Sequence, residues 1–268
     1  MNLIQTLQNR FAKPRGLIIP GNGGVHRTLT FKVALGICTH RDVKLQVFNL
    51  LRGLESCPDP KINVAMCVGD ALIDRSRSKI ASEFLMKRDE DILWFIDDDI
   101  VTNNQDMTRM MWEMWKYDLD ILCAPYALKS MKEKAFAVRL LENKDEVVCG
   151  KGGEIKEIMY ASTGCMGIRR RVFEKMVEKE LVHLCHPETQ RFYPFFCPME
   201  KNLNGKWIYL SEDWAACERA RSLGFKVWAD FGTKLGHIGA YTYTFDDFLA
   251  PPVEKKEGFV YRVDIQRE

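Results

Sequence analysis

Five consecutive apolar residues run directly into three consecutive aspartates in the first half of this chain. The run is Ile92–Ile96, and the aspartates are Asp97, Asp98 and Asp99. A short apolar run bounded by polar residues is typical of a strand buried on both faces, as in a parallel sheet. Carboxylates crowded at a strand end repel one another, and a cation is the usual reason to hold them together. The stretch therefore predicts an α/β protein with a binding site at the end of a buried strand.

Strands and helices are expected to alternate through the first half of the chain. Strands are predicted at 31–38, 62–69, 92–96 and 120–126, and helices at 43–54, 72–88 and 105–117. This alternation indicates a mostly parallel sheet with helices on both faces. The second half is less regular. It predicts strands at 134–142, 146–153, 225–231 and 258–265, helices at 171–179 and 211–224, and loops over 181–206.

Composition limits the class of protein to which the chain can belong. With 268 residues and 46% apolar content, the chain is long enough for one large domain with a substantial core. A net charge of +2 does not indicate a dedicated nucleic-acid-binding protein. The nine cysteines are scattered, which is typical of reduced thiols, and no apolar run reaches the length of a membrane span. We expect a cytoplasmic protein without stable membrane insertion, in the host cytoplasm if the chain is viral.

The aspartate cluster is the first candidate site. If the strand continued through it, Asp97 and Asp99 would point to one side, roughly 6–7 Å apart, and Asp98 to the other. A hard divalent cation can bridge such a gap directly or through water. Ligands of an open parallel sheet gather at the carboxyl ends of its strands, where this cluster lies. The alternative is a solvated acidic turn, but the density of carboxylates after a buried strand favours a site.

Two further features lie late in the sequence. Glu212 and Asp213 fall in the first turn of a predicted helix with Ser211 as its N-cap, where the helix dipole favours acidic side chains whatever their role. The same dipole would keep Asp213 ionised, as a general base requires. His237 lies in a glycine-flanked loop, and imidazole beside carboxylates suits Mn²⁺ better than Mg²⁺. Taken alone, each feature is explained as well by ordinary surface structure.

Together these features resemble the GT-A glycosyltransferases. Their order is an apolar strand ending in Asp-x-Asp, then "STGCMGIRRRVFEKM" (162–176), then "SEDW" (211–214), then a late histidine. The chain is most similar, over roughly residues 31–240, to the family-2-like group of inverting enzymes. The resemblance implies a Rossmann-like α/β catalytic domain at 31–250, with a nucleotide-binding half at about 31–127 and an acceptor-side half at about 128–250. Residues 1–30 and 251–268 would be an N-terminal extension and a C-terminal tail.

The resemblance also implies roles for individual residues. Asp99 would be the direct metal ligand, Asp97 would lie near the metal or the ribose, and His237 would complete the metal shell. Asp213 would be the catalytic base of the Glu-Asp motif that begins at Glu212. The remaining residues implied to contact the nucleotide sugar are Thr39, His40, Arg41, Asp74, Arg77, Asp98 and Gly164. The family often has Ala-Arg-Asn where this chain has Ser76-Arg77-Ser78. The contact that the family's asparagine makes is therefore not carried over to Ser78.

The expected activity is inverting transfer of a sugar from a nucleoside-diphosphate sugar, most commonly UDP-linked, to an acceptor hydroxyl, with Mn²⁺ or Mg²⁺. The cation would neutralise the departing diphosphate, Arg77 would add a bidentate clamp, and Asp213 would take the proton of the attacking hydroxyl. A glycan, a lipid-linked intermediate, a protein or a modified DNA base would each supply such a hydroxyl. The sequence does not choose among them.

Two other functions remain open at this point. A sugar-nucleotide nucleotidyltransferase also uses carboxylates and metal, but it usually has a glycine-rich basic loop after the first strand, which "GICTHRDV" (36–43) does not provide. A non-catalytic carbohydrate-binding protein would explain the aromatic residues of "RFYPFFCP" (191–198) but not the aspartates.

Three shorter segments carry lesser predictions. The aromatic segment 191–198 is predicted to be a hydrophobic plug in preference to an acceptor platform. The basic run "GIRRR" (167–171) is predicted to be a solvated helix start. The segment "HLCHPE" (183–188) is predicted to be a loop, because no second pair of ligands follows at zinc-finger spacing.

Overall fold

A computed structural model describes residues 31–40, 42–57, 59–129, 135–141, 146–203, 205–239, 242–244 and 258–262. The chain divides into two units, residues 1–30 and residues 31–268, and the description concerns the second unit. No helix in the described part of the chain is both long and apolar enough to cross a bilayer.

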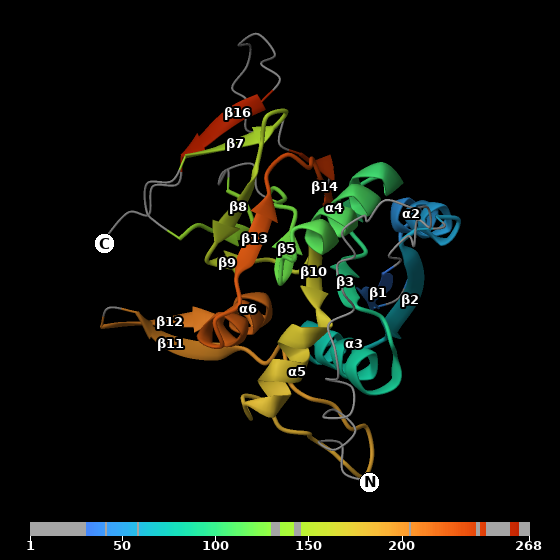
Figure 1. The fold of residues 1–268 in the computed structure, drawn as a ribbon, viewed down its shortest axis with the longest axis vertical. Helices are drawn as coiled ribbons and strands as arrows, with labels where there is room; N and C mark the ends of the chain where they lie inside the picture. The colour runs from blue at the N-terminus through green and yellow to red at the C-terminus, as the bar shows by residue number, and fades with distance from the viewer. Residues whose placement is uncertain are drawn as a thin grey trace, which may run out of the picture. The chain divides into compact units, whose positions relative to one another are not determined.

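A seven-stranded sheet forms the centre of the second unit (Figure 1). Its strands follow the order β2 (Lys61–Val68), β1 (Lys32–Thr39), β3 (Ile92–Ile96), β10 (Cys165–Arg169), β5 (Ile121–Cys123), β13 (Val227–Asp230) and β8 (Ile155–Ile158). All run in one direction except β10 and β8, which are antiparallel to their neighbours. The carboxyl ends of β1, β3, β5 and β13 therefore meet at one edge of the sheet.

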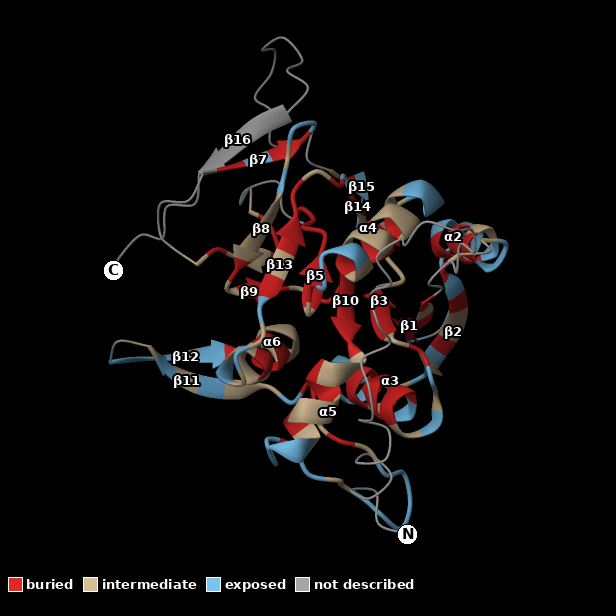
Figure 2. Ribbon diagram, in the orientation of Figure 1, coloured by how far each residue is buried: buried red, intermediate tan, exposed pale blue. Residues whose placement is uncertain are grey.

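Helices cover both faces of this sheet. One face packs against α2 (Leu45–Glu55) and α4 (Asn104–Lys116), and the other against α3 (Ile73–Lys87), α5 (Arg170–Glu178) and α6 (Glu212–Ser222). Alternate residues of a strand enter different cores, so Trp94 joins the α2–α4 core while Leu93 and Phe95 join the other. Figure 2 shows the buried residues gathered along the central strands and the inner sides of the helices.

Local sequence explains the helix that covers β3 and β5. In α4, four methionines at the spacing of one helical face are fully buried: Met107, Met110, Met111 and Met114. The helix begins after Asn103, whose side chain accepts a hydrogen bond from the Asp106 amide and so caps the helix. This cap fixes the start of α4 a few residues after the aspartates.

Smaller sheets complete the described structure. One contains β4 (Ile100–Val101), β14 (Gly236–Ile238) and β15 (Thr242–Tyr243). The others are the pairs β11 (Met199–Leu203) with β12 (Lys206–Leu210), β7 (Glu146–Gly150) with β16 (Gly258–Arg262), and β6 (Val138–Arg139) with β9 (Tyr160–Ala161). The pairing of β4 with β14 matters most for function, because β4 follows directly on the three aspartates.

The predicted fold class, α/β with a mostly parallel central sheet between helices, is confirmed. The buried strand at 92–96 and the early helices lie where the sequence predicts them, to within two residues. Predictions for the second half of the chain are less accurate. No strand was expected at 165–169, where β10 lies in the middle of the sheet, and the loop expected over 181–206 contains β11. Both strands are antiparallel, so the alternation of strands and helices does not reveal them.

The basic run at 167–171 is a helix start, as predicted, because α5 begins at Arg170, but Arg169 and Arg170 are not solvated. Arg169 donates to the carbonyls of Met114, Trp115 and Leu119 at the end of α4, and Arg170 donates to carbonyls at the end of α3. The last carbonyls of a helix have no partner within the helix, and these guanidinium groups satisfy them.

The prediction for the aromatic segment 191–198 is confirmed in its preferred form. Phe195 and Phe196 are fully buried and Tyr193 is nearly so, in the core shared with α3 and α5. The segment is a hydrophobic plug, and these three rings are not available to a sugar.

Candidate active site

The three aspartates occupy a turn after β3. The Asp97 amide donates to the carbonyl of Gly164 at 3.0 Å, and the Ile100 amide donates to the carbonyl of Asp97 at 3.2 Å. The alternation expected for a continued strand is therefore wrong, because the backbone turns at Asp98. The three carboxylates do not share one partner. Each contacts a different group from another part of the chain.

Arg77 of α3 joins two of the sequence motifs. Its Nη2 donates to both oxygens of Asp97 at 2.8 and 2.9 Å, and its Nη1 donates to Oε1 of Glu212 at 2.5 Å. The arginine side chain is only 4% exposed. Burial lowers the pKa of this guanidinium, but the two carboxylates outweigh burial and the net pKa is raised. A buried, permanently charged group thus holds the end of β3 against the start of α6.

The two acidic residues at the start of α6 lie in different environments. Burial raises the pKa of Glu212, Arg77 opposes this effect, and the net direction is upward. Asp213 accepts hydrogen bonds at Oδ1 from the Ser211 hydroxyl and, at 2.8 Å, from the Trp214 amide. Ser211 occupies the expected N-cap position, but its hydroxyl contacts Asp213 and makes no cap bond to the backbone. Within the described part of the chain, the other oxygen of Asp213 has no hydrogen-bond partner, so it can accept a proton.

The end of β1 lies beside the aspartate turn. The hydroxyl of Thr39 donates to Oδ2 of Asp98 at 2.9 Å, and the next residue, His40, is exposed. Arg41 lies outside the described residues. Asp74 is half-buried in the first turn of α3, one helical turn before the buried arginine. The structure thus brings the predicted Thr39 and Asp98 into direct contact.

A strand pairing brings Asp99 and His237 together from distant parts of the chain. His237 of β14 lies opposite Ile100 of β4, and the Ile238 amide donates to the carbonyl of Asp99 at 2.8 Å. Nε2 of His237 lies 3.6 Å from Oδ2 of Asp99, and the ammonium of Lys129 contacts the same oxygen. Burial raises the pKa of Asp99, but His237 and Lys129 outweigh it and hold this pKa well below its ordinary value.

A backbone carbonyl fixes the tautomer of His237. Nδ1 lies 2.8 Å from the carbonyl oxygen of Ala127. A carbonyl only accepts, so Nδ1 of the neutral ring carries the proton and Nε2 keeps its lone pair. Metal-binding histidines are commonly oriented in this way, with the other ring nitrogen donating to a carbonyl. When the ring is neutral, Asp99 and His237 therefore present two lone-pair donors toward one another; when it is protonated, Nε2 donates toward Asp99.

This donor pair fits a divalent cation only in part. Carboxylate oxygen and imidazole nitrogen suit Mn²⁺, so Asp99 and His237 are the residues that would hold such an ion. Among the described residues, no group of three or more His, Cys, Asp or Glu side chains is arranged to hold a metal ion. Asp97, the third ligand implied by the sequence, has both oxygens hydrogen-bonded to Arg77. The protein by itself therefore supplies an incomplete metal shell.

Two residues that the sequence did not single out belong to this site. One is Lys129, and the other is Tyr126, whose ring packs edge-on against His237 with centroids 4.8 Å apart. A Cβ at Gly164 would lie 2.7 Å from the Tyr126 hydroxyl oxygen, so glycine makes room for this ring. Burial raises the pKa of Tyr126, and the nearby Asp97 adds to the effect. The available signal was position, because "APY" ends a predicted parallel strand where ligands gather.

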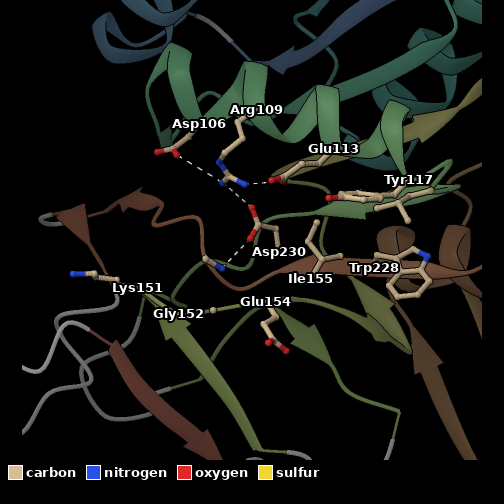
Figure 3. A pocket seen from close by; sticks show the side chains of 14 residues that line it. Asp106, Arg109, Glu113, Tyr117, Lys151, Gly152, Glu154, Ile155, Trp228 and Asp230 are labelled. Atoms are coloured by element: carbon tan, nitrogen blue, oxygen red, sulfur yellow. Dashed lines mark hydrogen bonds and ion pairs between the residues drawn. The ribbon is translucent and has the colours of Figure 1, made fainter. Parts of the chain in front are cut away.

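A separate cavity of about 790 Å³ lies between α4 and the ends of β13 and β8 (Figure 3). Arg109, which lines this cavity, contacts Glu113 at 2.7 Å, Asp230 at 2.8 Å and Thr233 at 2.5 Å. The charged residues that line the cavity are Asp106, Arg109, Glu113, Lys151, Glu154 and Asp230, and most are acidic. The negative balance disfavours a diphosphate here, and the guanidinium is already engaged by protein groups.

The structure shows a mixed α/β protein with a mostly parallel central sheet and an acidic turn at the carboxyl end of β3. Among solved structures, the chain is similar to the crystal structure of A197 from STIV, with a TM-score of 0.51, 17% sequence identity, and coverage of 78% of this chain and 86% of that one. At this identity the likeness concerns the fold alone. The structure of residues 1–349 of S. aureus TarS is also similar, with a TM-score of 0.41, 12% identity, and coverage of 80% of this chain and 60% of that one. No family model and no curated protein sequence matches the chain.

Proposed function

We propose that the chain is an inverting glycosyltransferase that uses a nucleoside-diphosphate sugar. The observation that carries the proposal is the meeting of three sequence motifs at one edge of the sheet. Arg77 links the aspartate turn to the start of α6, and the pairing of β4 with β14 adds His237. These contacts connect residues far apart in the sequence, and the predicted activity needs all three motifs together.

The donor diphosphate is proposed to bind near Asp99 and His237 together with Mn²⁺ or Mg²⁺. Such an ion would neutralise the charge of the departing nucleoside diphosphate, an effect of several kcal/mol at about 4 Å and an effective dielectric near 20. UDP is proposed as the nucleotide because it is the commonest in enzymes that the sequence resembles. The residues proposed to contact the nucleotide sugar are Thr39, His40, Arg41, Asp74, Asp98 and Gly164.

Arg77 is proposed to act on the donor indirectly. Because its guanidinium is buried between Asp97 and Glu212, it is poorly available as the diphosphate clamp that the sequence predicted. Its proposed role is to hold these two carboxylates, and with them the turn that contains Asp99, in one geometry. We therefore count it as a positioning residue.

Asp213 is proposed to be the general base, with Glu212 supporting its position. The oxygen of Asp213 that lacks a partner would take the proton of an acceptor hydroxyl, while the Trp214 amide and the Ser211 hydroxyl hold the other oxygen. Attack from the face opposite the diphosphate would invert the anomeric carbon in a single displacement. The acceptor remains one of the four classes named above, a glycan, a lipid-linked intermediate, a protein or a modified DNA base, and the cytoplasmic location stays a prediction.

Product release distinguishes this proposal from its rivals. Incubation of the protein with UDP-, GDP- and TDP-sugars and Mn²⁺ should release nucleoside diphosphate, whereas a nucleotidyltransferase would release or consume pyrophosphate. A carbohydrate-binding protein would bind sugar in calorimetry without nucleotide or Mn²⁺ and would release neither product.

Substitution of the base tests the assigned mechanism. Asp213→Asn should lower turnover by about 10²–10⁴-fold, the usual contribution of a general base. The matched control is Glu154→Gln, which removes a carboxylate from the separate cavity and should leave turnover unchanged. Full activity of folded Asp213→Asn protein, with folding checked by circular dichroism, would reject this role for Asp213.

A further inference from the structure

A lysine lies where the divalent ion is proposed to bind. The Lys129 ammonium contacts Oδ2 of Asp99, the oxygen that also faces Nε2 of His237 at 3.6 Å. The lysine stem packs along Gly239, where an added Cβ would lie 3.3 Å from Cδ of Lys129. The stem of Lys129 therefore lies beside Gly239, and its ammonium contacts Asp99.

The ammonium and a divalent ion cannot both use this oxygen at close range. A divalent ion bound to Oδ2 would lie about 2.0–2.6 Å from it, and a hydrogen-bonded ammonium about 2.8 Å from it. Two cations on one oxygen would be only a few ångströms apart and would repel strongly in this partly buried site. The lysine side chain is 36% exposed, and its flexible four-carbon stem gives the ammonium a route to solvent.

We propose that Lys129 is a built-in cation of this site, which competes with the divalent ion for Asp99 and leaves the carboxylate when the ion binds. The inference rests on the proposed function for the identity of the ion. Lys129 keeps Asp99 neutralised when no ion is present, and in doing so it weakens the affinity of the protein for the ion. Removal of the ammonium should therefore strengthen metal binding, whereas removal of a residue that merely supports the site would weaken it.

The test measures Mn²⁺ affinity directly, by electron paramagnetic resonance of free Mn²⁺, with neither donor nor acceptor present. Lys129→Met should lower the Kd for Mn²⁺ by about tenfold or more, the usual value of a charged hydrogen bond. Lys129→Gln provides a second uncharged variant, and Lys129→Arg should remain close to wild type because it keeps the charge. Asp99→Asn combined with Lys129→Met should abolish the gain.

The matched control removes a lysine elsewhere. Lys226 pairs with Glu157 at 2.8 Å outside the site, so Lys226→Met changes the net charge equally and should leave the Kd for Mn²⁺ unchanged. An equal gain in the control, or Kd values for both uncharged Lys129 variants within twofold of wild type, would overturn the proposal. Failure to detect Mn²⁺ binding in wild type and in these variants would also overturn it.

Transfer is assayed separately, which keeps the two ideas distinct. Tighter Mn²⁺ binding by Lys129→Met without release of nucleoside diphosphate by any variant would reject the glycosyltransferase and keep the competition at Asp99. Release of nucleoside diphosphate without metal, together with unchanged Mn²⁺ affinity in the Lys129 variants, would reject the competition at Asp99 and keep the glycosyltransferase.

Discussion

Arg77 is the single residue on which the geometry of the candidate site depends most. Its guanidinium is buried between two carboxylates, one in the turn after β3 and one at the start of α6. Removal of one partner from a buried ion pair leaves the other charges uncompensated, which is more costly than the loss of a surface pair. Without the arginine, Asp97 and Glu212 would face each other as two unpaired carboxylates.

Arg77→Met should lower the free energy of unfolding by about 3–5 kcal/mol, measured by urea denaturation. The control is Arg75→Met on the same helix, which removes an exposed guanidinium while Asp70 keeps Lys79 as a partner, and should cost no more than about 1 kcal/mol. Equal effects of the two substitutions would show that the buried pair does not stabilise the site.

The Asp99 carboxylate should make stability depend on pH in the acid range. Its folded-state pKa is held below the ordinary value near 3.9, so its contribution is fully present above that pH and is lost as pH falls toward the folded pKa. In urea denaturation at a series of pH values from 6 to 3, the free energy of unfolding of wild type should fall more steeply below pH 4 than that of Asp99→Asn. Parallel curves would contradict this assignment.

At the scale of elements, β10 has a strict packing requirement. It lies between β3 and β5, and a Cβ at Gly167 would be 2.4 Å from the ring of Trp94 and 2.8 Å from the sulfur of Met114. Both neighbours are fully buried, so neither can move aside freely.

Gly167→Ala should therefore destabilise the fold by about 1–3 kcal/mol, the usual cost of overpacking a core. Gly36→Ala in β1 is the control, because the nearest side-chain atoms there lie at 3.0–3.1 Å and need to shift less. Thermal unfolding of the two variants should rank them in that order, and the opposite rank would contradict the packing argument.

The hairpin of β11 and β12 carries the exposed aromatic rings that the plug segment does not provide. Trp207 and Tyr209 are 68% and 73% exposed, and both lie on one side of β12, two residues apart. This strand leads directly into the start of α6 and the proposed base. Sugars stack on aromatic faces, so the hairpin is a better candidate for an acceptor platform than residues 191–198.

Replacement of Trp207 and Tyr209 together by Ser should leave the free energy of unfolding within about 0.5 kcal/mol of wild type, as expected for exposed positions. If the rings hold the acceptor, the KM for acceptor should rise while hydrolysis of the donor by water is unchanged. Leu45→Ser, a substitution at another exposed apolar residue, serves as control. An unchanged KM would exclude the platform.

At the scale of the whole molecule, the sequence correctly predicted the elements and motifs that depend on short local patterns of residues. The apolar run at 92–96 and the methionine face of α4 determine their elements without help from distant residues. The candidate residues of the aspartate turn and the Glu-Asp pair could likewise be recognised from short motifs. Their contacts could not, because the resemblance implied a donor-binding role for Arg77, and its burial between Asp97 and Glu212 is visible only in the structure.

The missed features all depend on pairing between distant segments. Tyr126 is marked only by its position after a predicted parallel strand, and nothing near Lys129 marks it. Both reach the site because β5 lies beside β10 and β14 returns to β4. Strand alternation failed at 97–99 because a turn begins there, and a turn changes the direction of every following side chain. Contacts between segments that are distant in the sequence therefore determine the details of the site.

The position of β10 between β3 and β5 also has a consequence for biosynthesis. A ribosome that has released residues 31–127 has produced β3 and β5 but not the strand that joins them, so both present unsatisfied backbone edges. A purified fragment of residues 31–127 should show fast amide hydrogen exchange throughout, whereas a fragment of residues 31–244 should retain protected amides in β3. The nascent protein can join β3 to β5 only after Arg169 has left the exit tunnel, and it can complete its sheet only after β13 has followed.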